Sequence, residues 1–244
     1  MQCHTIDDLT HFIYPNIQLH QPDQYFLDRT VLSSRNDEVD EINTTILDKF
    51  PGEKHILMGV DSIDLDNPHD GNYNPYPMEY LNSLNVSGLP LAKLVLKVGC
   101  PIMLLRNLDP SQGLCNGTHM RVLGIHSRVL HCKIISGDIR FANKEVMIPR
   151  IQLSSSAETL PIPLKHRQFP VCLAFAMTIN KSQGQSVKYV GINLQTSVFS
   201  HGQLYVVFSR YTSCHRIRVL LPQQYNNKTI NVVYKEVLSG LDLG

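Results

Sequence analysis

The amino-acid sequence predicts an α/β fold in which a parallel-sheet domain is interrupted by a small β-rich insert. Three observations predict it: a strand and helix over residues 29–52, closely spaced β-prone runs over residues 91–153, and a strand–helix–strand series over residues 187–221. Strands that alternate with helices are typical of parallel sheets, whereas closely spaced short strands are typical of small barrels. The 244 residues, 43% of them hydrophobic, are enough for one large domain with an insert.

The first strand and helix are predicted by a short apolar run and the residues that follow it. Arg29–Ser34 indicates a buried strand. Asn36 is the expected N-cap of the helix, and Asp37 and Glu38 stand in its first turn, where carboxylates interact favourably with the helix dipole. Apolar residues then recur at helical spacing: Val39, Ile42, Ile46 and Phe50. The Pro-Gly pair at residues 51–52 ends the helix.

The middle of the chain has the pattern of a separate β domain. Residues 61–90 are rich in Asp, Asn, Pro and Gly, and we expect a connecting loop there. Glycine- and asparagine-containing turns then separate four β-prone runs: Leu94–Leu105, Met120–Ile125, Val129–Ile135 and Val146–Ile151. The sequence therefore predicts three parts, with a small barrel at residues 91–166 inserted between an α/β portion at residues 1–90 and its remainder at residues 167–244.

The α/β pattern returns after the insert. Val171–Met177 is apolar and is expected to form a buried helix that ends in the polar loop Thr178–Ser186, and Val187–Leu194 is a predicted strand. Ser200-His-Gly-Gln203 has the form of a capping box, in which the hydroxyl caps a helix and the Gln side chain reaches back. That helix is expected to leave Arg210 off its apolar side. The side chains that it is expected to bury are Leu204, Val207, Phe208 and Tyr211.

Charge is strongly segregated along the chain, although the net charge is only +1. Residues 1–90 contain 15 acidic and 4 basic residues, whereas residues 91–244 contain 6 acidic and 18 basic residues. A basic half attracts a polyanion such as nucleic acid, and a solvated lysine-rich surface is the alternative interpretation.

Several functional classes are disfavoured by the sequence. The apolar runs are too short to span a bilayer and the N-terminus lacks the pattern of a secretory signal, so we expect an intracellular protein without a membrane partner. The six cysteines include no C-x-x-C pair, and Cys115 with His119 is too weak a pattern to predict zinc, so no metal site is expected. The absence of G-x-S-x-G disfavours a serine hydrolase.

Several stretches, in order along residues 5–225, resemble the PIF family of superfamily-one DNA helicases. Phe175-Ala-Met-Thr-Ile-Asn-Lys-Ser-Gln-Gly184 resembles motif V, and Ser200-His-Gly-Gln-Leu-Tyr-Val-Val-Phe-Ser-Arg210 resembles motif VI. Val31–Asn43 resembles the strand and helix that open the second RecA-like domain of the family. Lys97–Asp109 and Leu114–Thr118 resemble the SH3-like insert.

Other details place the resemblance within the family. Arg167-Gln-Phe-Pro170 and Val198-Phe-Ser-His201 are similar to Helitron-encoded members. Two departures occur: Val207-Phe208 stands where motif VI usually reads Ala-Leu, and Asn180 stands where motif V often has His. The family fold implied is a RecA-like parallel-sheet domain, the second motor domain, with an inserted small SH3-like β-barrel.

The resemblance implies the C-terminal motor half of an ATP-dependent 5′–3′ DNA helicase. Such enzymes act in DNA replication, repair, recombination or Helitron transposition, and the expected location is the nucleus, with mitochondria as the alternative. ATP and Mg²⁺ are the cofactors implied for the complete enzyme, and none is expected to bind this chain alone. The implied partners are single-stranded DNA and a missing N-terminal RecA-like domain.

The resemblance also implies roles for individual residues. Arg210 is the expected arginine finger, because arginine carries a permanent charge and a planar fork suited to phosphate. The residues expected to couple nucleotide to DNA are Thr178, Lys181, Ser182, Gln183, Gly184, Gln203, Tyr205 and Ser209. The DNA-binding candidates on the insert are Lys97, Arg106, Asn116, Arg121 and Lys133.

The sequence contains no segment of the form G-x-x-x-x-G-K-[ST], the loop that cradles the phosphates of ATP. The acidic motif that holds Mg²⁺ in the first RecA-like domain is also absent. We therefore expect that this chain by itself does not hydrolyse ATP. The alternatives are a non-catalytic fragment that binds single-stranded DNA and the remnant of a decayed transposon.

Overall fold

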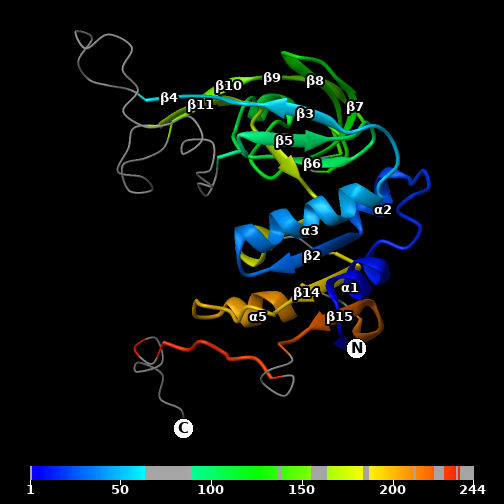
Figure 1. Ribbon diagram of the computed structural model, residues 1–244, viewed down its shortest axis with the longest axis vertical. Coiled ribbons are helices and arrows are strands. Elements are labelled where there is room, and N and C mark those ends of the chain that lie inside the picture. The colour runs from blue at the N-terminus through cyan, green and yellow to red at the C-terminus, as the bar shows by residue number, and fades with distance from the viewer. Residues whose placement is uncertain are drawn as a thin grey trace. The chain divides into compact units, whose positions relative to one another are not determined.

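The computed structural model describes residues 2–63, 89–136, 139–154, 164–183, 187–210, 213–222, 228–234 and 236, which form two compact units (Figure 1). The first unit comprises residues 1–49 and 175–244, and the second comprises residues 50–174. The boundaries expected near residues 90 and 166 therefore fall inside the second unit.

Strand pairing explains where the second unit begins. β3 (His55–Met58) pairs with β5 (Lys93–Leu96), and β4 (Val60–Ile63) pairs with β11 (Leu164–Gln168). Asp61–Ile63, expected in a loop, belong to β4, and most of the remaining expected loop lies outside the described residues.

The first unit is built on a five-stranded sheet in the order β1-β15-β14-β2-β13. All pairings among the described strands of this sheet are parallel, which confirms the predicted parallel α/β fold. Its strands are β1 (Gln2–Cys3), β15 (Ile217–Leu220), β14 (Tyr189–Asn193), β2 (Arg29–Ser33) and β13 (Ala176–Thr178).

Helices contact the sheet of this unit on two faces. They are α1 (Ile6–Ile13), α2 (Asp23–Leu27), α3 (Asn36–Lys49) and α5 (Gln203–Phe208). α1 lies against Gly191 of β14, where an added Cβ would stand 3.0 Å from Ile13 and 3.2 Å from Leu9, so a side chain at this position would push the helix away. On the other face, Val190 and Ile192 of the same strand share a buried cluster with Val207 of α5.

Val171–Met177, expected to be a helix, is instead divided between two strands, so that prediction is wrong. β12 (Val171–Leu173) pairs with β6 (Pro101–Leu104) of the second unit, whereas β13 pairs with β2 of the first. A short apolar run does not distinguish a buried strand from a buried helix, and two short strands in succession look like one longer run.

Buried side chains fix the point at which the chain returns to the first unit. The Asn43 amide of α3 accepts hydrogen bonds from the backbone N–H groups of Phe175 (3.1 Å) and Ala176 (2.9 Å) and donates to the Ala176 carbonyl (3.1 Å). The Tyr14 hydroxyl donates to the Phe175 carbonyl at 2.6 Å. These contacts set the register of β13, and therefore the position of the residues that follow it.

The second unit consists of antiparallel sheets, which confirms the predicted small β-containing insert. One sheet has the order β12-β6-β7-β8-β9, another has the order β10-β11-β4, and β3 pairs with β5. The remaining strands are β7 (His119–Ile125), β8 (Val129–Ile134), β9 (Glu145–Pro149) and β10 (Ile151–Ser154). The buried Gln168 ties this unit together, because its amide donates to the carbonyls of Leu57 and Ala92 while its oxygen accepts from Arg150.

Among the described residues, no helix has both the length and the apolar character needed to cross a membrane.

His119 makes the stability of the second unit dependent on pH. Burial lowers its pKa from 6.5 to about 4, and its Nε2 atom is buried without a hydrogen-bond partner. Between pH 6.5 and 4, His119 binds a proton in the unfolded chain but stays neutral in the folded chain. The free energy of unfolding should therefore fall as the pH falls through this range, by up to about 1.4 kcal/mol per pH unit. Denaturant melts at several pH values measure this slope, and His119→Leu should reduce it.

His126→Leu is the matched control, because His126 is exposed in the same unit. The prediction fails if the His119→Leu and His126→Leu proteins lose stability with acid to the same extent as the unaltered chain.

Candidate functional site

Three neighbouring strands of the parallel sheet end in polar residues at the same level. Thr178 of β13 and Asn193 of β14 are both in register with Ser33, the last residue of β2. In open parallel sheets, ligand sites lie beyond the carboxyl ends of the strands. The loops that follow these three strands therefore form one candidate site, the carboxyl edge.

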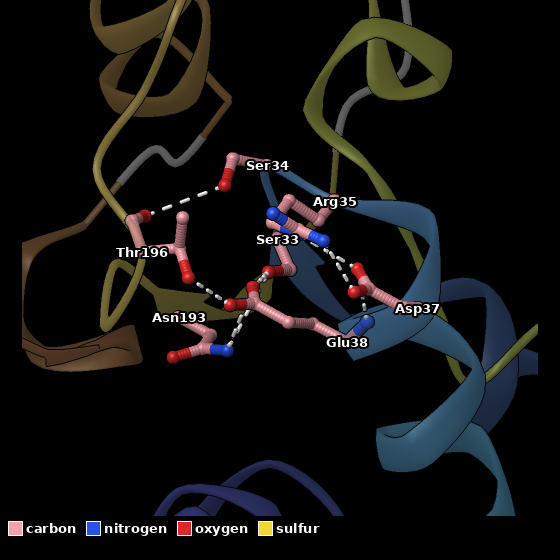
Figure 2. Close-up of polar contacts among 7 residues, drawn as sticks. All are labelled: Ser33, Ser34, Arg35, Asp37, Glu38, Asn193 and Thr196. Atoms are coloured by element: carbon pink, nitrogen blue, oxygen red, sulfur yellow. Dashed lines mark hydrogen bonds and ion pairs between the residues drawn. The ribbon is translucent and has the colours of Figure 1, made fainter.

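A single carboxylate holds two of these loops (Figure 2). Glu38, in the first turn of α3, accepts hydrogen bonds from the hydroxyls of Ser33 and Thr196, and the Asn193 amide donates to it at 3.3 Å. The Ser34 hydroxyl also donates to the Thr196 carbonyl, at 3.3 Å. The end of β2, the start of α3 and the loop after β14 are thereby joined through one side chain.

An ion pair between Arg35 and Asp37 lies beside this cluster (Figure 2). The Arg35 Nε and Nη2 atoms lie 2.9 and 2.6 Å from the two carboxylate oxygens of Asp37, and this hydrogen bonding lowers the pKa of the Asp37 carboxyl. The same carboxylate accepts from the backbone N–H of Glu38 at 3.1 Å. Both side chains are largely exposed, so the pair should add little to stability.

The residues of motif V form a short 3-10 helix, η2 (Ile179–Ser182), directly after β13. Ser182 is buried and its hydroxyl donates to the Ile179 carbonyl at 2.7 Å, whereas Lys181 and Gln183 are exposed. Thr178 precedes η2 and is half-buried. Gly184 lies outside the described residues.

Gln203, the first residue of α5, connects that helix to η2. Its side chain is buried, with its oxygen accepting from the Phe199 N–H at 3.1 Å and its amide donating to the Asn180 oxygen at 3.4 Å. The predicted capping box at Ser200–Gln203 is wrong, because Gly202 caps α5 in a left-handed conformation with no side-chain hydrogen bond. The Gln203 side chain does bond to a residue before the helix, but it accepts from the Phe199 N–H and not from the N–H of Ser200.

Arg210 follows the last turn of α5. Its Nη2 atom donates to the Ser209 hydroxyl at 2.9 Å, its Nε atom donates to the Val206 carbonyl at 3.2 Å, and the Ser209 hydroxyl donates to that carbonyl at 2.8 Å. These bonds hold the guanidinium near the end of the helix. Tyr205 is 77% exposed and contributes to an open apolar hollow beside α5.

The burial predicted for this helix is only partly correct. Val207 is buried and Leu204 is half-buried, but Phe208 is 40% exposed. A helix of six residues packs only one side against the sheet, and Phe208 lies off that side. Tyr211 lies outside the described residues.

The candidate DNA-binding residues of the second unit differ sharply in exposure. Lys97 is buried and its ammonium donates to the Phe50 carbonyl, and Arg121 is buried and donates to the Gly99 carbonyl at 3.1 Å. Burial removes both cations from any surface that a DNA strand could reach. Arg106 and Asn116 are exposed, and Lys133 is half-buried.

Comparison with known proteins adds sequence similarity to this geometry. Residues 79–125 match the family model described as DNA helicase Pif1, 2B domain. The chain is 31% identical over 195 residues to the ATP-dependent DNA helicase PIF1 of Homo sapiens, covering 78% of this chain and 27% of the relative. It is 27% identical over 231 residues to PIF7 of Trypanosoma brucei brucei, covering 83% of this chain and 21% of the relative. The chain thus spans about a quarter of the length of these curated relatives.

Solved structures show the same fold. The Bacteroides Pif1 structure bound to single-stranded DNA superposes with a TM-score of 0.62 at 20% identity, covering 96% of this chain and 48% of that one. Pif1 helicase from Candida albicans gives a TM-score of 0.61 at 22% identity, covering 96% and 52% of the two chains.

The Glu38 cluster should contribute measurably to the stability of the first unit. Glu38→Ala leaves the hydroxyls of Ser33 and Thr196 and the amide of Asn193 without their acceptor, and we expect the free energy of unfolding to fall by about 1–3 kcal/mol. Urea denaturation followed by circular dichroism measures the change.

Glu41→Ala is the matched control, because Glu41 is an exposed residue of the same helix. Its effect should stay within about 0.5 kcal/mol. Equal effects of the two substitutions would show that the Glu38 contacts add nothing beyond an ordinary surface position.

Proposed function

Because this chain belongs to the Pif1 family of DNA helicases, we propose that it forms the C-terminal part of an ATP-dependent helicase motor that moves 5′ to 3′ on single-stranded DNA. In this proposal the first unit acts as the second RecA-like motor domain and the second unit acts as its inserted 2B domain. The match of residues 79–125 to the 2B model and the identity to PIF helicases support the assignment.

The observation that carries the proposal is the connection between η2 and α5 through Gln203. Arg210 at the end of α5 is the group that would contact the γ-phosphate of ATP, and Lys181 on η2 is the group that would contact DNA. A cation in contact with the transferred phosphoryl group stabilises the charge that develops during hydrolysis. The buried side chain of Gln203 bonds to both loops, and it would therefore couple the nucleotide site to the DNA site.

ATP and Mg²⁺ would be bound in this proposal by a P-loop domain that is not encoded in these 244 residues, since the sequence contains no P-loop motif. The residues of this chain supply the opposing wall of the nucleotide site. Thr178, Ser182, Gln183, Tyr205 and Ser209 would shape that wall and its connection to DNA.

A second candidate function is binding of single-stranded DNA without turnover. The excess of basic residues after residue 90 favours it, and Arg106 with Asn116 would contribute from the second unit. The likeness of Arg167–Pro170 and Val198–His201 to Helitron-encoded members supports DNA transposition as one setting for either function. Replication, repair and recombination are the others, and the nucleus is the proposed location.

ATP hydrolysis tests the first candidate. The purified chain should show no DNA-stimulated ATPase activity, whereas a polypeptide that joins it to the P-loop domain of a Pif1 relative should hydrolyse ATP when DNA is added. In that polypeptide, Arg210→Ala should lower kcat by about 10³-fold with little change in DNA affinity, because the arginine acts on the transition state. A coupled assay for ADP release measures both.

Arg216→Ala is the matched control, since Arg216 is an exposed arginine that precedes β15 and so lies away from the carboxyl ends of the strands. Near-normal turnover after Arg210→Ala would contradict the arginine-finger role.

DNA binding tests the part of the proposal that both candidates share. The chain alone should bind single-stranded DNA weakly, with log K falling against log salt by roughly 0.7 for each phosphate neutralised. Arg106→Ala should reduce the size of that slope by about 0.7. Lys49→Ala should leave the slope unchanged, because Lys49 pairs with Asp7 at 2.8 Å in the first unit. Fluorescence anisotropy at several salt concentrations decides the matter. Affinity that does not respond to salt would leave the basic residues as a solvated surface.

A further inference from the structure

The loop between β14 and α5, residues 194–202, exposes a large aromatic side chain at the carboxyl edge. Phe199 is 61% exposed, whereas its neighbour Val198 is 4% exposed and belongs to the buried cluster of the first unit. An exposed ring on a loop loses the free energy that burial would provide. An aromatic ring exposed at this edge is accessible to a ligand that could cover it.

Hydrogen bonds hold this loop before Phe199 and at Phe199 itself. Before it, the Thr196 hydroxyl donates to Glu38 and the Thr196 carbonyl accepts from Ser34. At the residue itself, the backbone N–H of Phe199 donates to the buried oxygen of Gln203 at 3.1 Å. The backbone that carries the ring is therefore fixed in advance, which lowers the entropic cost of binding a ligand there.

An exposed cation, Lys181, lies on the turn that Gln203 joins to this loop. Gln203 bonds through its oxygen to the Phe199 N–H and through its amide to Asn180, the residue before Lys181. One side chain thus joins the loop that carries the exposed ring to the turn that carries the exposed ammonium. An aromatic face beside a cation is the arrangement by which proteins bind single-stranded nucleic acid without sequence preference.

We propose that Phe199 is a base-stacking residue for single-stranded DNA, with Lys181 contacting the adjacent phosphate. Gln203 and Glu38 act as positioning residues, because they fix the two loops without touching the strand. The proposal rests on the proposed function and adds a specific contact to it. The polar neighbours Asn180 and Ser200 favour a nucleobase over a protein surface, which would require a broader apolar face.

A tryptophan reporter tests the stacking directly. The chain contains no tryptophan, so Phe199→Trp introduces a single indole at the proposed contact. Addition of a deoxythymidine oligonucleotide should quench its fluorescence, because a stacked thymine accepts an electron from the excited indole. Leu19→Trp is the matched control, since Leu19 is 58% exposed in the same unit but lies before β2, and its fluorescence should not change.

Affinity provides an independent measurement on the full chain. By fluorescence anisotropy, Phe199→Ala should weaken binding of the same oligonucleotide about tenfold, whereas Phe199→Tyr should retain it within about twofold. Lys181→Ala should weaken binding and reduce the salt slope by about 0.7. Leu19→Ala should leave the affinity unchanged.

The outcomes separate this inference from the proposed function. If the unaltered chain binds DNA but Phe199→Ala does not weaken it, or if the indole at residue 199 is not quenched, the stacking contact is wrong and DNA binding stands. If the unaltered chain shows no binding at low salt, the shared DNA-binding proposal fails and the inference fails with it.

Discussion

The chain leaves its parallel sheet after α3 and returns at Phe175, and the amide of Asn43 binds the backbone at that return point. The two ends of this contact are 132 residues apart in the sequence. A shift of one residue in β13 would place its side chains on the opposite faces of the sheet. Because η2 begins where β13 ends, the same shift would move Lys181 away from α5. The position of the carboxyl edge therefore depends on the contact between Asn43 and the start of β13.

Apolar packing and polar side chains have different roles in the first unit. Apolar packing on both faces of the sheet, with Gly191 allowing α1 to come close, supplies most of the stability. Polar side chains at the carboxyl edge then select one arrangement of the loops. Glu38 and Gln203 each satisfy partners from more than one loop, so that neither loop can move without breaking a hydrogen bond that is partly shielded from water.

Local signals in the sequence predicted several elements, but they missed the helices at Ile6–Ile13 and Asp23–Leu27 and could not predict long-range contacts. The strand Arg29–Ser33 and the helix after it follow from periodicity and turn residues. Two of the three partners of Glu38, Asn193 and Thr196, lie 155 and 158 residues away, beyond the reach of any such pattern. A capping box was predicted at Ser200, where Gly202 in a left-handed conformation prevents it, whereas the structure has one at Thr5, which shares reciprocal hydrogen bonds with Asp8. Burial of Lys97 and Arg121 likewise depends on distant strands that composition does not identify.

The places where the insert joins the first unit have an evolutionary consequence. Its two attachment points follow α3 and precede β13, which contact each other directly, so the first unit can retain the register of its sheet whatever the connecting polypeptide contains. Duplication, loss or exchange of that polypeptide would leave the residues of the carboxyl edge in place. Evolution can therefore replace the insert while the packing of the parallel-sheet unit is inherited unchanged.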